Sequence, residues 1–351
     1  MKAIKVVSGG KAAVMDSPIP QLRPDYVRVK TAAVALNPTD WKHIAFMPDV
    51  EGCTSGCDYA GVVQEVGANV TTLNVGDRIA GWTHGGNKTN KEDGSFAEYL
   101  VAKEGIQLKI PDNVSFEDAA TLGVGISTIG QGLYQSLGLP LPSHPSSERF
   151  PLLIYGGSTA TGALAIQFAK LSGLEVIATC SPRNFEMVKS LGADAVFDYN
   201  SPTVGADIRK HTGNKLYYAF DCIAEGNSAQ ICADALADAP SDGVAAAKKP
   251  MYSALLYCDF PRKDVEAKYT LAYTTFGEAF TKSFGPGNFP ASKEDYEFGK
   301  MFWKLTEELL AKGKFKVHNP DVRTGGLEGV LEGLEELRQG KVSGKKLVYK
   351  L

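Results

Sequence analysis

The sequence predicts an α/β protein in which a doubly wound parallel sheet is joined to a smaller, mostly antiparallel β-barrel. Two observations support this prediction. Short runs with strand periodicity fill the first third of the chain, and strands alternate with helices from residue 152 to residue 221. The length of 351 residues fits two domains.

The barrel strands come first in the chain. Glycine and aspartate bound several short apolar runs, and glycine suits the tight turns between strands because it has no Cβ. Such strands are typical of a small barrel. The runs are residues 26–35, 58–67, 73–81 and 96–101.

The parallel sheet follows a predicted helix at 127–138 and a Pro- and Ser-rich loop at 139–147. Strands and helices of this length in alternation indicate a parallel sheet covered on both faces. The strands are expected at 152–155, 175–179, 195–197 and 217–221, and the helices at 162–171 and 184–191.

The last part of the chain returns to the barrel. It contains predicted helices at 298–310 and 327–337 and a strand at 346–349. We therefore expect a barrel domain at 1–124, a parallel-sheet domain at 125–285, and a return segment at 286–351 that completes the barrel domain.

Composition and charge narrow the class of protein. A net charge of −3 gives no basic field for nucleic acid or an anionic membrane, so neither is an expected partner. The chain has no apolar run of about 18 residues, and its first ten residues lack the apolar region of a secretory signal. We expect a soluble, cytoplasmic protein whose six cysteines are buried thiols without disulfides.

The most informative motif is the strand, turn and helix over residues 152–167. Small residues after the strand allow a pyrophosphate to reach the N–H groups and the positive dipole end of the helix. The alternative is an ordinary tight turn, but the motif stands at the first strand of a βαβ run, which favours dinucleotide binding. The glycines of the motif are Gly156, Gly157 and Gly162, and the predicted phosphate contacts are Ser158, Thr159, Ala160 and Thr161.

The end of the next strand bears on the choice of cofactor. An NAD site typically has a carboxylate there, which binds the ribose 2′-hydroxyl. In this chain the residues at the end of the strand offer a hydroxyl and a guanidinium but no acid. These groups accommodate a 2′-phosphate, so the sequence favours NADPH. Tyr199 is either a contact to the same adenosine or a surface tyrosine at a strand end. The predicted adenosine contacts are Ser181, Pro182, Arg183, Asn184 and Tyr199.

Together, the runs at 56–63, 67, 76–79 and 156–162 resemble the medium-chain dehydrogenase/reductase superfamily over the whole chain. The resemblance implies a GroES-like catalytic domain and a Rossmann domain. In zinc-dependent members a Cys precedes a Ser/Thr-Asp pair and a Gly-His-Glu follows, but this chain has Asn37 and Cys57-Asp58 there. Cys57 and His43 cannot complete a tetrahedral site, so we expect no metal. The zinc-free branch reduces activated carbon–carbon double bonds or quinones.

A narrower set of motifs is similar to the fungal trans-acting enoyl reductases of polyketide biosynthesis, of the lovastatin-pathway type. The motifs are residues 36–40, 125–128, 138–142, 155–161, 178–184 and 196–199. Residues 236–264 depart from the pattern, since the Gly-rich turn expected there reads Ala239-Pro240-Ser241-Asp242-Gly243.

The resemblance implies further site residues. Beside the nicotinamide it places Pro38, Thr39, Asp40 and Trp41, and near the cofactor Leu255, Leu256, Ser343 and Gly344. Along the acyl substrate, in an apolar crevice between the domains, it places Thr128, Ile129, Gly130, Gln131, Gly132, Leu133, Tyr134, Gln135, Leu271, Ala272, Tyr273, Thr274 and Thr275.

The implied reaction is hydride addition to the β-carbon of an α,β-unsaturated thioester, followed by protonation of the enolate. Thr128 is the candidate donor to the developing oxyanion, and Lys42 is a second catalytic candidate or an exposed lysine on a turn. Asp40 is expected to orient loop backbone rather than to move protons, and His43 is either a functional or a structural imidazole.

Three functions stay open at this point. The motifs favour an NADPH-dependent enoyl reductase that acts on the carrier-bound chain of a polyketide synthase or of its hybrid with a peptide synthetase. A free-standing quinone or enone reductase shares every cofactor feature, and a cofactor-binding scaffold or repurposed non-redox enzyme is the third alternative. The resemblance implies a monomer, and docking to an acidic carrier protein would need basic residues such as Arg149, Arg262 and Lys263.

Overall fold

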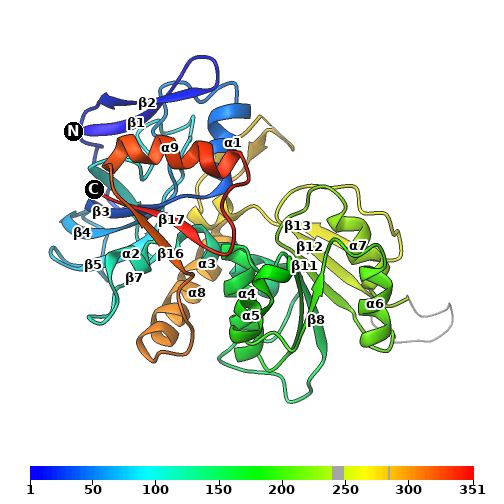
Figure 1. The fold of residues 1–351 in the computed structure, drawn as a ribbon. Helices are drawn as coiled ribbons and strands as arrows, with labels where there is room; N and C mark the ends of the chain where they lie inside the picture. Colours follow the sequence, from blue (N-terminus) through cyan, green and yellow to red (C-terminus); the bar gives the residue numbers. More distant parts are fainter. Residues whose placement is uncertain (239–248, 284) are drawn as a thin grey trace. The chain divides into compact units, whose positions relative to one another are not determined.

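The computed structural model describes residues 1–238, 249–283 and 285–351, and the chain divides into two compact units. Unit 1 comprises Met1–Ser127 and Tyr273–Leu351, and unit 2 comprises Thr128–Ala272. The turn expected at 239–243 lies outside the described residues. Figure 1 shows the elements of each unit.

Unit 1 is built on a sheet that joins the two ends of the chain. The strand order is β16-β17-β3-β4-β5-β7, with β6 paired to β3, and every pairing is antiparallel except β16 with β17. The strands are β3 (Tyr26–Ala35), β4 (Asp58–Val66), β5 (Arg78–Trp82), β6 (Tyr99–Lys103), β7 (Gln107–Lys109), β16 (Pro320–Arg323) and β17 (Lys346–Lys350). In Figure 1 the red β17 runs beside the blue β3.

The remaining elements of unit 1 cover this sheet or extend it. Residues of α1 and α9 belong to one apolar core with Val34, Leu36 and Leu347 of the sheet. The further strands are β1 (Lys2–Val7), β2 (Lys11–Asp16), β14 (Phe280–Thr281) and β15 (Asn288–Phe289). The helices are α1 (Pro38–Phe46), α2 (Phe116–Ala119), α3 (Gly123–Ile129), α8 (Lys293–Ala311), α9 (Gly326–Arg338) and the 3-10 helix at Ala272–Phe276. Of these, α3 ends in unit 2 and the 3-10 helix begins there. The β1–β2 hairpin is absent from the sequence prediction.

Unit 2 is a six-stranded parallel sheet with the order β10-β9-β8-β11-β12-β13. The chain runs outward from β8 to β10 and then crosses back to β11, so β8 and β11 flank the switch point of a doubly wound sheet. The strands are β8 (Pro151–Tyr155), β9 (Glu175–Cys180), β10 (Ala195–Asp198), β11 (Tyr218–Asp221), β12 (Met251–Ala254) and β13 (Glu266–Tyr269).

Helices lie on both faces of this sheet, with α4 and α5 on one side and α6 and α7 on the other (Figure 1). The Rossmann architecture predicted from the sequence is therefore confirmed. The helices are α4 (Ala160–Leu171), α5 (Phe185–Ser190), α6 (Val204–His211), α7 (Ser228–Ala235), and a 3-10 turn at Pro182–Asn184.

The structure also differs from the sequence prediction in one helix and in both domain boundaries, since unit 1 extends to Ser127 rather than to residue 124. The helix expected at 127–138 is divided into α3 and a π-helix at Gly130–Ser136, in which the Leu137 N–H reaches the Gly132 carbonyl at 3.2 Å. The return to unit 1 begins at Tyr273 rather than at 286, because Tyr273 and Phe276 pack on Trp82 of that unit.

None of the described helices is both long and apolar enough to cross a membrane. The six cysteines are free thiols; five are buried and Cys258 is half-buried.

Candidate active site

The turn after β8 in unit 2 has the geometry of a phosphate cradle. Gly156 has a φ of 82°, which favours glycine, and a Cβ on Gly162 would overlap the Gly156 carbonyl oxygen. Thr159 caps α4, and its hydroxyl accepts from the Gly162 N–H at 2.9 Å. The N–H groups of Ala160 and Thr161 have no acceptor within the helix, so they fit the anionic phosphates of a dinucleotide.

The adenosine end lies where β9 and β10 finish. The two strands pair in parallel with Asp198 opposite Cys180, so Tyr199 and Ser181 both follow the same edge of the sheet. Arg183 is exposed and makes no hydrogen bond or ion pair with any described residue, while Tyr199 is 40% exposed. An unpaired guanidinium at the same edge of the sheet as a hydroxyl and an accessible ring fits a phosphorylated ribose.

Asp221 is a residue of this edge that sequence reasoning missed. Its carboxylate accepts from the N–H groups of Ile223 and Ala224, both at 2.9 Å, and from the Tyr252 hydroxyl at 2.8 Å. It thereby links the segment after β11 to Tyr252 of β12, and Leu255 and Leu256 follow β12 directly. An acid that ends an apolar strand was the available signal, since a buried carboxylate needs donors.

The first turn of α1 in unit 1 carries the residues predicted for the nicotinamide end. Pro38 begins the helix, where its missing N–H costs nothing, and Asp40 accepts from the Asn37 N–H at 2.7 Å. Burial raises the pKa of Asp40 to about 7. The contact agrees with the expected role of Asp40 in orienting loop backbone.

Two residues predicted for different ligands meet here. The hydroxyls of Thr39, a predicted cofactor contact, and Tyr273, a predicted substrate contact, are 2.9 Å apart. The Tyr273 ring stacks on His84 at 4.2 Å between centroids, and both line a cavity of about 10 Å³, which has room for about one water. Tyr273 is 5% exposed and positions the Thr39 hydroxyl within unit 1.

A buried amine lies behind this pair. The Lys282 ammonium is 3.3 Å from His43 Nε2 and 4.2 Å from the centre of the Tyr273 ring. Burial lowers the pKa of Lys282 to about 7, and burial together with the Lys282 charge lowers the pKa of His43 to about 3. His43 is therefore a neutral, internal imidazole, as the structural interpretation expected.

The positions that hold metal ligands in zinc-dependent relatives carry a different arrangement. Lys346 donates to Asn37 Oδ1 at 2.9 Å and to Asp58 Oδ2, and both side chains of the Lys346–Asp58 pair are buried. Burial, and then the charges of Asp40 and Asp58, raise the pKa of Cys57 well above its usual value. Among the described residues no group of three or more His, Cys, Asp or Glu side chains is arranged to hold a metal ion. Lys346 was missed because its partners Asn37 and Asp58 lie far from it in the sequence.

The two catalytic candidates differ in their surroundings. Thr128 is 7% exposed, and its side chain makes no hydrogen bond with any described residue. Lys42 is half-buried on α1, and its ammonium lies 5.7 Å from the Trp41 ring centre. Both stay predictions.

The segments predicted for the acyl chain are largely buried. Ile129, Leu133 and Thr275 have no exposed surface, and the Tyr134 hydroxyl lies 3.1 Å from the Ser172 hydroxyl. Ser343 and Gly344 lie just before β17, three and two residues from Lys346. The ligand-binding roles of these segments stay predictions.

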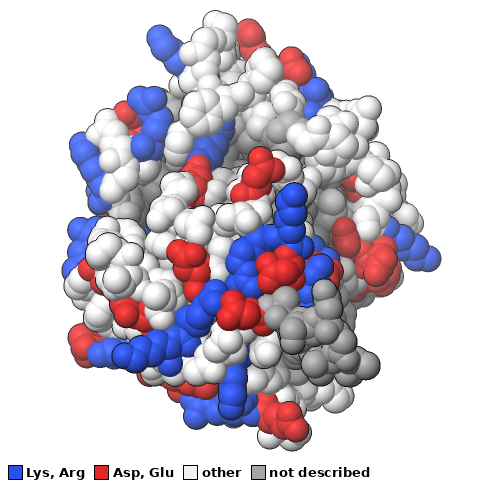
Figure 2. Space-filling model, turned by 90° about the vertical axis from the view of Figure 1, so that its right-hand side faces the viewer, with Lys and Arg blue, Asp and Glu red and all other residues white. Residues whose placement is uncertain are grey.

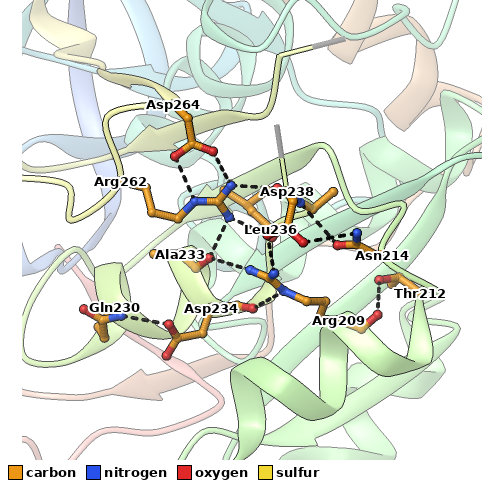
Figure 3. A network of polar contacts seen from close by, with 11 residues as sticks. Arg209, Thr212, Asn214, Gln230, Ala233, Asp234, Leu236, Asp238, Arg262 and Asp264 are labelled. Carbon is orange, nitrogen blue, oxygen red and sulfur yellow. Dashed lines mark hydrogen bonds and ion pairs between the residues drawn. The ribbon is translucent and has the colours of Figure 1, made fainter. Parts of the chain in front are cut away.

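Two of the three basic residues considered for carrier docking are engaged inside unit 2. In Figure 3 Arg262 donates to the carbonyls of Ala233 and Leu236 at the end of α7 and to Asp264. Arg149 pairs with Asp194. Figure 2 shows basic side chains interspersed with acidic ones on the face that it draws. Arg262 thus caps a helix C-terminus, where a cation is favourable.

This fold and these residues define a class, the dehydrogenases and reductases with a GroES-like and a nucleotide-binding domain. The alcohol dehydrogenase GroES-like domain family matches residues 23–112, and the zinc-binding dehydrogenase family matches residues 160–241. An alcohol dehydrogenase superfamily protein from Novosphingobium aromaticivorans has the same fold, with a TM-score of 0.79, 21% identity, and coverage of 100% of this chain and 99% of the other.

Curated relatives narrow the class. Trans-enoyl reductase ACTTS2 of Alternaria alternata is 48% identical over 100% of this chain and 98% of its own length. Trans-enoyl reductase resD of Aspergillus sclerotiorum is 45% identical over the full length of both chains. The chain belongs to the trans-enoyl reductase family and is an oxidoreductase, which confirms the family predicted from the sequence motifs.

Proposed function

We propose that the chain is an NADPH-dependent enoyl reductase that acts in trans on the α,β-double bond of a polyketide thioester. The observation that carries the reaction is full-length similarity to proteins named trans-enoyl reductases. The observation that supports the cofactor choice is the exposed, unpaired Arg183, which follows the same edge of the sheet as Ser181 and Tyr199. The acyl chain would be tethered to a partner polyketide synthase or synthase–peptide synthetase hybrid, and the enzyme would act as a cytoplasmic monomer.

Residues of unit 2 would bind the cofactor. The N–H groups at the start of α4 would hold the phosphates, and Arg183 would pair with the 2′-phosphate. NADPH supplies the hydride that the β-carbon of the substrate accepts.

Other residues of the chain would handle the charge that hydride addition creates. The negative charge moves to the thioester oxygen, and a hydroxyl donor aimed at it stabilises the transition state. Thr128 is the proposed donor. Lys42, one turn from Thr39 on α1, would add a positive charge. The enolate takes its proton at the α-carbon, and water can supply it.

The proposed reaction uses no metal, because two of the candidate ligand positions are tied into other contacts. The Asp58 carboxylate is paired with the Lys346 ammonium, and Asn37 supplies an amide where the zinc-dependent members of the superfamily have a thiolate. A stoichiometric zinc ion in the purified protein would contradict this.

The test is NADPH oxidation by the purified chain, with a crotonyl pantetheine thioester and with a simple quinone in parallel. The proposal predicts turnover of the thioester and formation of the saturated product. Turnover of the quinone alone would indicate a free-standing quinone reductase. Conversion of the thioester without NADPH oxidation would indicate a non-redox function.

A further inference from the structure

The buried ammonium of Lys346 connects three segments of unit 1 that are far apart in the sequence. It donates to Asn37 Oδ1 at 2.9 Å, to the Thr121 carbonyl at 3.3 Å and to Asp58 Oδ2. These contacts use the three N–H donors of the ammonium. The side chain of Lys346 is 3% exposed and that of Asp58 is 0% exposed, so water does not substitute for these contacts.

The sheet brings these groups to one place. Ala35 of β3 lies opposite both Val348 of β17 and Asp58 of β4, so the start of β17, the end of β3 and the start of β4 share one end of the sheet. The pairing thus sets Lys346 next to the carboxylate that it binds.

Asp58 adds a second contact to the segment that contains Thr121. Its second carboxylate oxygen accepts from the Val124 N–H at 2.7 Å. A Cβ on Gly123 would overlap this oxygen, so glycine is required for the close approach. Both oxygens of Asp58 are therefore engaged, one by a charged donor and one by backbone.

The connected segments carry the residues assigned to the reaction. Asn37 immediately precedes Pro38–Trp41 of α1, and its N–H is held by Asp40 at 2.7 Å. Lys346 follows Gly344 by two residues and Ser343 by three. A shift of the ammonium would move both segments at once.

We propose that Lys346, with Asp58 and Asn37, is a positioning residue of the reductase: its ammonium holds the first turn of α1 and residues 343–344 in register for the cofactor and the reacting double bond. The inference rests on the proposed function. Lys346 acts through its neighbours and does not touch the reacting atoms. Small misplacements of reacting groups cost up to about 100-fold in rate, so the effect of losing this register is measurable.

The test separates positioning from stability with a double variant. Lys346→Met leaves the Asp58 charge buried without a partner and destabilises unit 1, whereas Lys346→Met with Asp58→Asn removes both charges. The double variant is expected to regain most of the urea midpoint lost by the single variant. Its kcat with the thioester should nevertheless stay about 10–100-fold below wild type, and its Kd for NADPH should rise about 10-fold.

A second variant keeps the test decisive if the double variant does not fold. Asn37→Ser retains a residue that can cap α1, but its hydroxyl is too short to reach Lys346. Because the Lys346–Asp58 pair stays intact, its urea midpoint should fall much less than that of Lys346→Met, while its kcat still falls. Lys350→Met is the matched control, because Lys350 lies on the same strand and pairs with Glu117 at the surface, so its kcat and Kd should equal those of wild type.

The outcomes are distinguishable from failure of the proposed function. The Kd for NADPH is measured from nicotinamide fluorescence and needs no turnover. If the wild type binds NADPH but reduces no thioester, the proposed function is wrong, and the Kd comparison still tests Lys346. A stably folded double variant or Asn37→Ser variant with wild-type kcat and Kd would overturn the inference.

Discussion

The two units place one cationic side chain each beside predicted cofactor residues, and the surroundings of these two side chains are opposite. Lys346 of unit 1 is buried and uses all its donors on groups of its own unit. Arg183 of unit 2 is exposed and makes no hydrogen bond or ion pair within the described residues. A cation with every donor engaged holds the protein together, whereas one left unpaired at a sheet edge is available to a ligand.

The largest expected effect comes from breaking the Lys346 contacts. Asp58→Ala leaves the ammonium buried without its carboxylate, which costs about 3–5 kcal/mol of the free energy of unfolding. Urea denaturation measures the loss. Glu297→Ala, which removes an exposed partner of Lys300 on α8, should leave the urea midpoint nearly unchanged. Equal midpoints for Asp58→Ala and wild type would show that the buried pair contributes nothing.

The second effect is the pH dependence of stability that arises from Asp40, whose carboxylate accepts from the Asn37 N–H. Burial raises the pKa of Asp40 to about 7 in the folded chain, above its usual value near 3.9. Between these values the folded state binds more protons than the unfolded state, so stability from this group is present at low pH and is lost as pH rises through about 7. Asp40→Asn removes the titrating group, so the variant does not lose stability in this way as pH rises. Its free energy of unfolding, relative to that of wild type, should therefore rise by about 2–3 kcal/mol from about pH 5 to pH 8.

The matched control is Asp112→Asn, an exposed aspartate of unit 1. Its stability relative to wild type should not change over this pH range. A flat difference for Asp40→Asn as well would mean that the Asp40 carboxyl titrates as it does in water.

The third effect tests the unpaired cation of unit 2. Arg183→Ala removes a charge-assisted contact to the 2′-phosphate, worth about 1.5–2 kcal/mol, so the Kd for NADPH should rise about 10–30-fold. The Kd for NADH should stay unchanged, because NADH lacks that phosphate. Fluorescence titration with both cofactors measures the two values.

Lys215→Ala is the control for this charge. Lys215 is exposed and precedes β11, so it lies at the opposite edge of the sheet, and its loss should change neither Kd. An equal loss of affinity for NADPH and NADH in Arg183→Ala would refute the 2′-phosphate role.

The smallest expected effect is on cofactor affinity and comes from the Tyr199 ring, which is distinguished here from the charge of Arg183. Tyr199→Ala removes a ring that is 40% exposed at the end of β10, and ring stacking contributes about 1 kcal/mol. Both Kd values should rise about 5-fold, since NADPH and NADH share the adenine. A loss confined to NADPH would assign Tyr199 to the phosphate instead.

The difference between the two units also explains which parts of the molecule could be predicted from the sequence. The phosphate turn is local, so the order of strand, small residues and helix was enough to locate Ser158–Thr161 and the cap on α4. The strands of unit 2 up to β11 followed from their alternation with helices, but β12 and β13 did not, because the pattern breaks after residue 236. The Rossmann and GroES-like fold and the family were predicted and are confirmed.

The contacts of unit 1 could not be predicted in this way. Lys346 and Asn37 are 309 positions apart, and their contact depends on the register of β17, β3 and β4, which no local pattern sets. The available signal was a lysine at the start of an apolar strand, since a buried lysine requires a partner. The contact between Thr39 and Tyr273 likewise depends on the return of the chain to unit 1 at Tyr273.

The proposed hydride transfer is tested most directly with NADPH that carries deuterium at both hydrogen positions of C4 of the nicotinamide. The purified chain is mixed with this cofactor and a crotonyl pantetheine thioester, and the product is examined by mass spectrometry and NMR. We predict one deuterium per saturated product, located at the β-carbon. A saturated product without deuterium at the β-carbon, or recovery of the unsaturated thioester alone, would contradict the assignment as an enoyl reductase that uses NADPH.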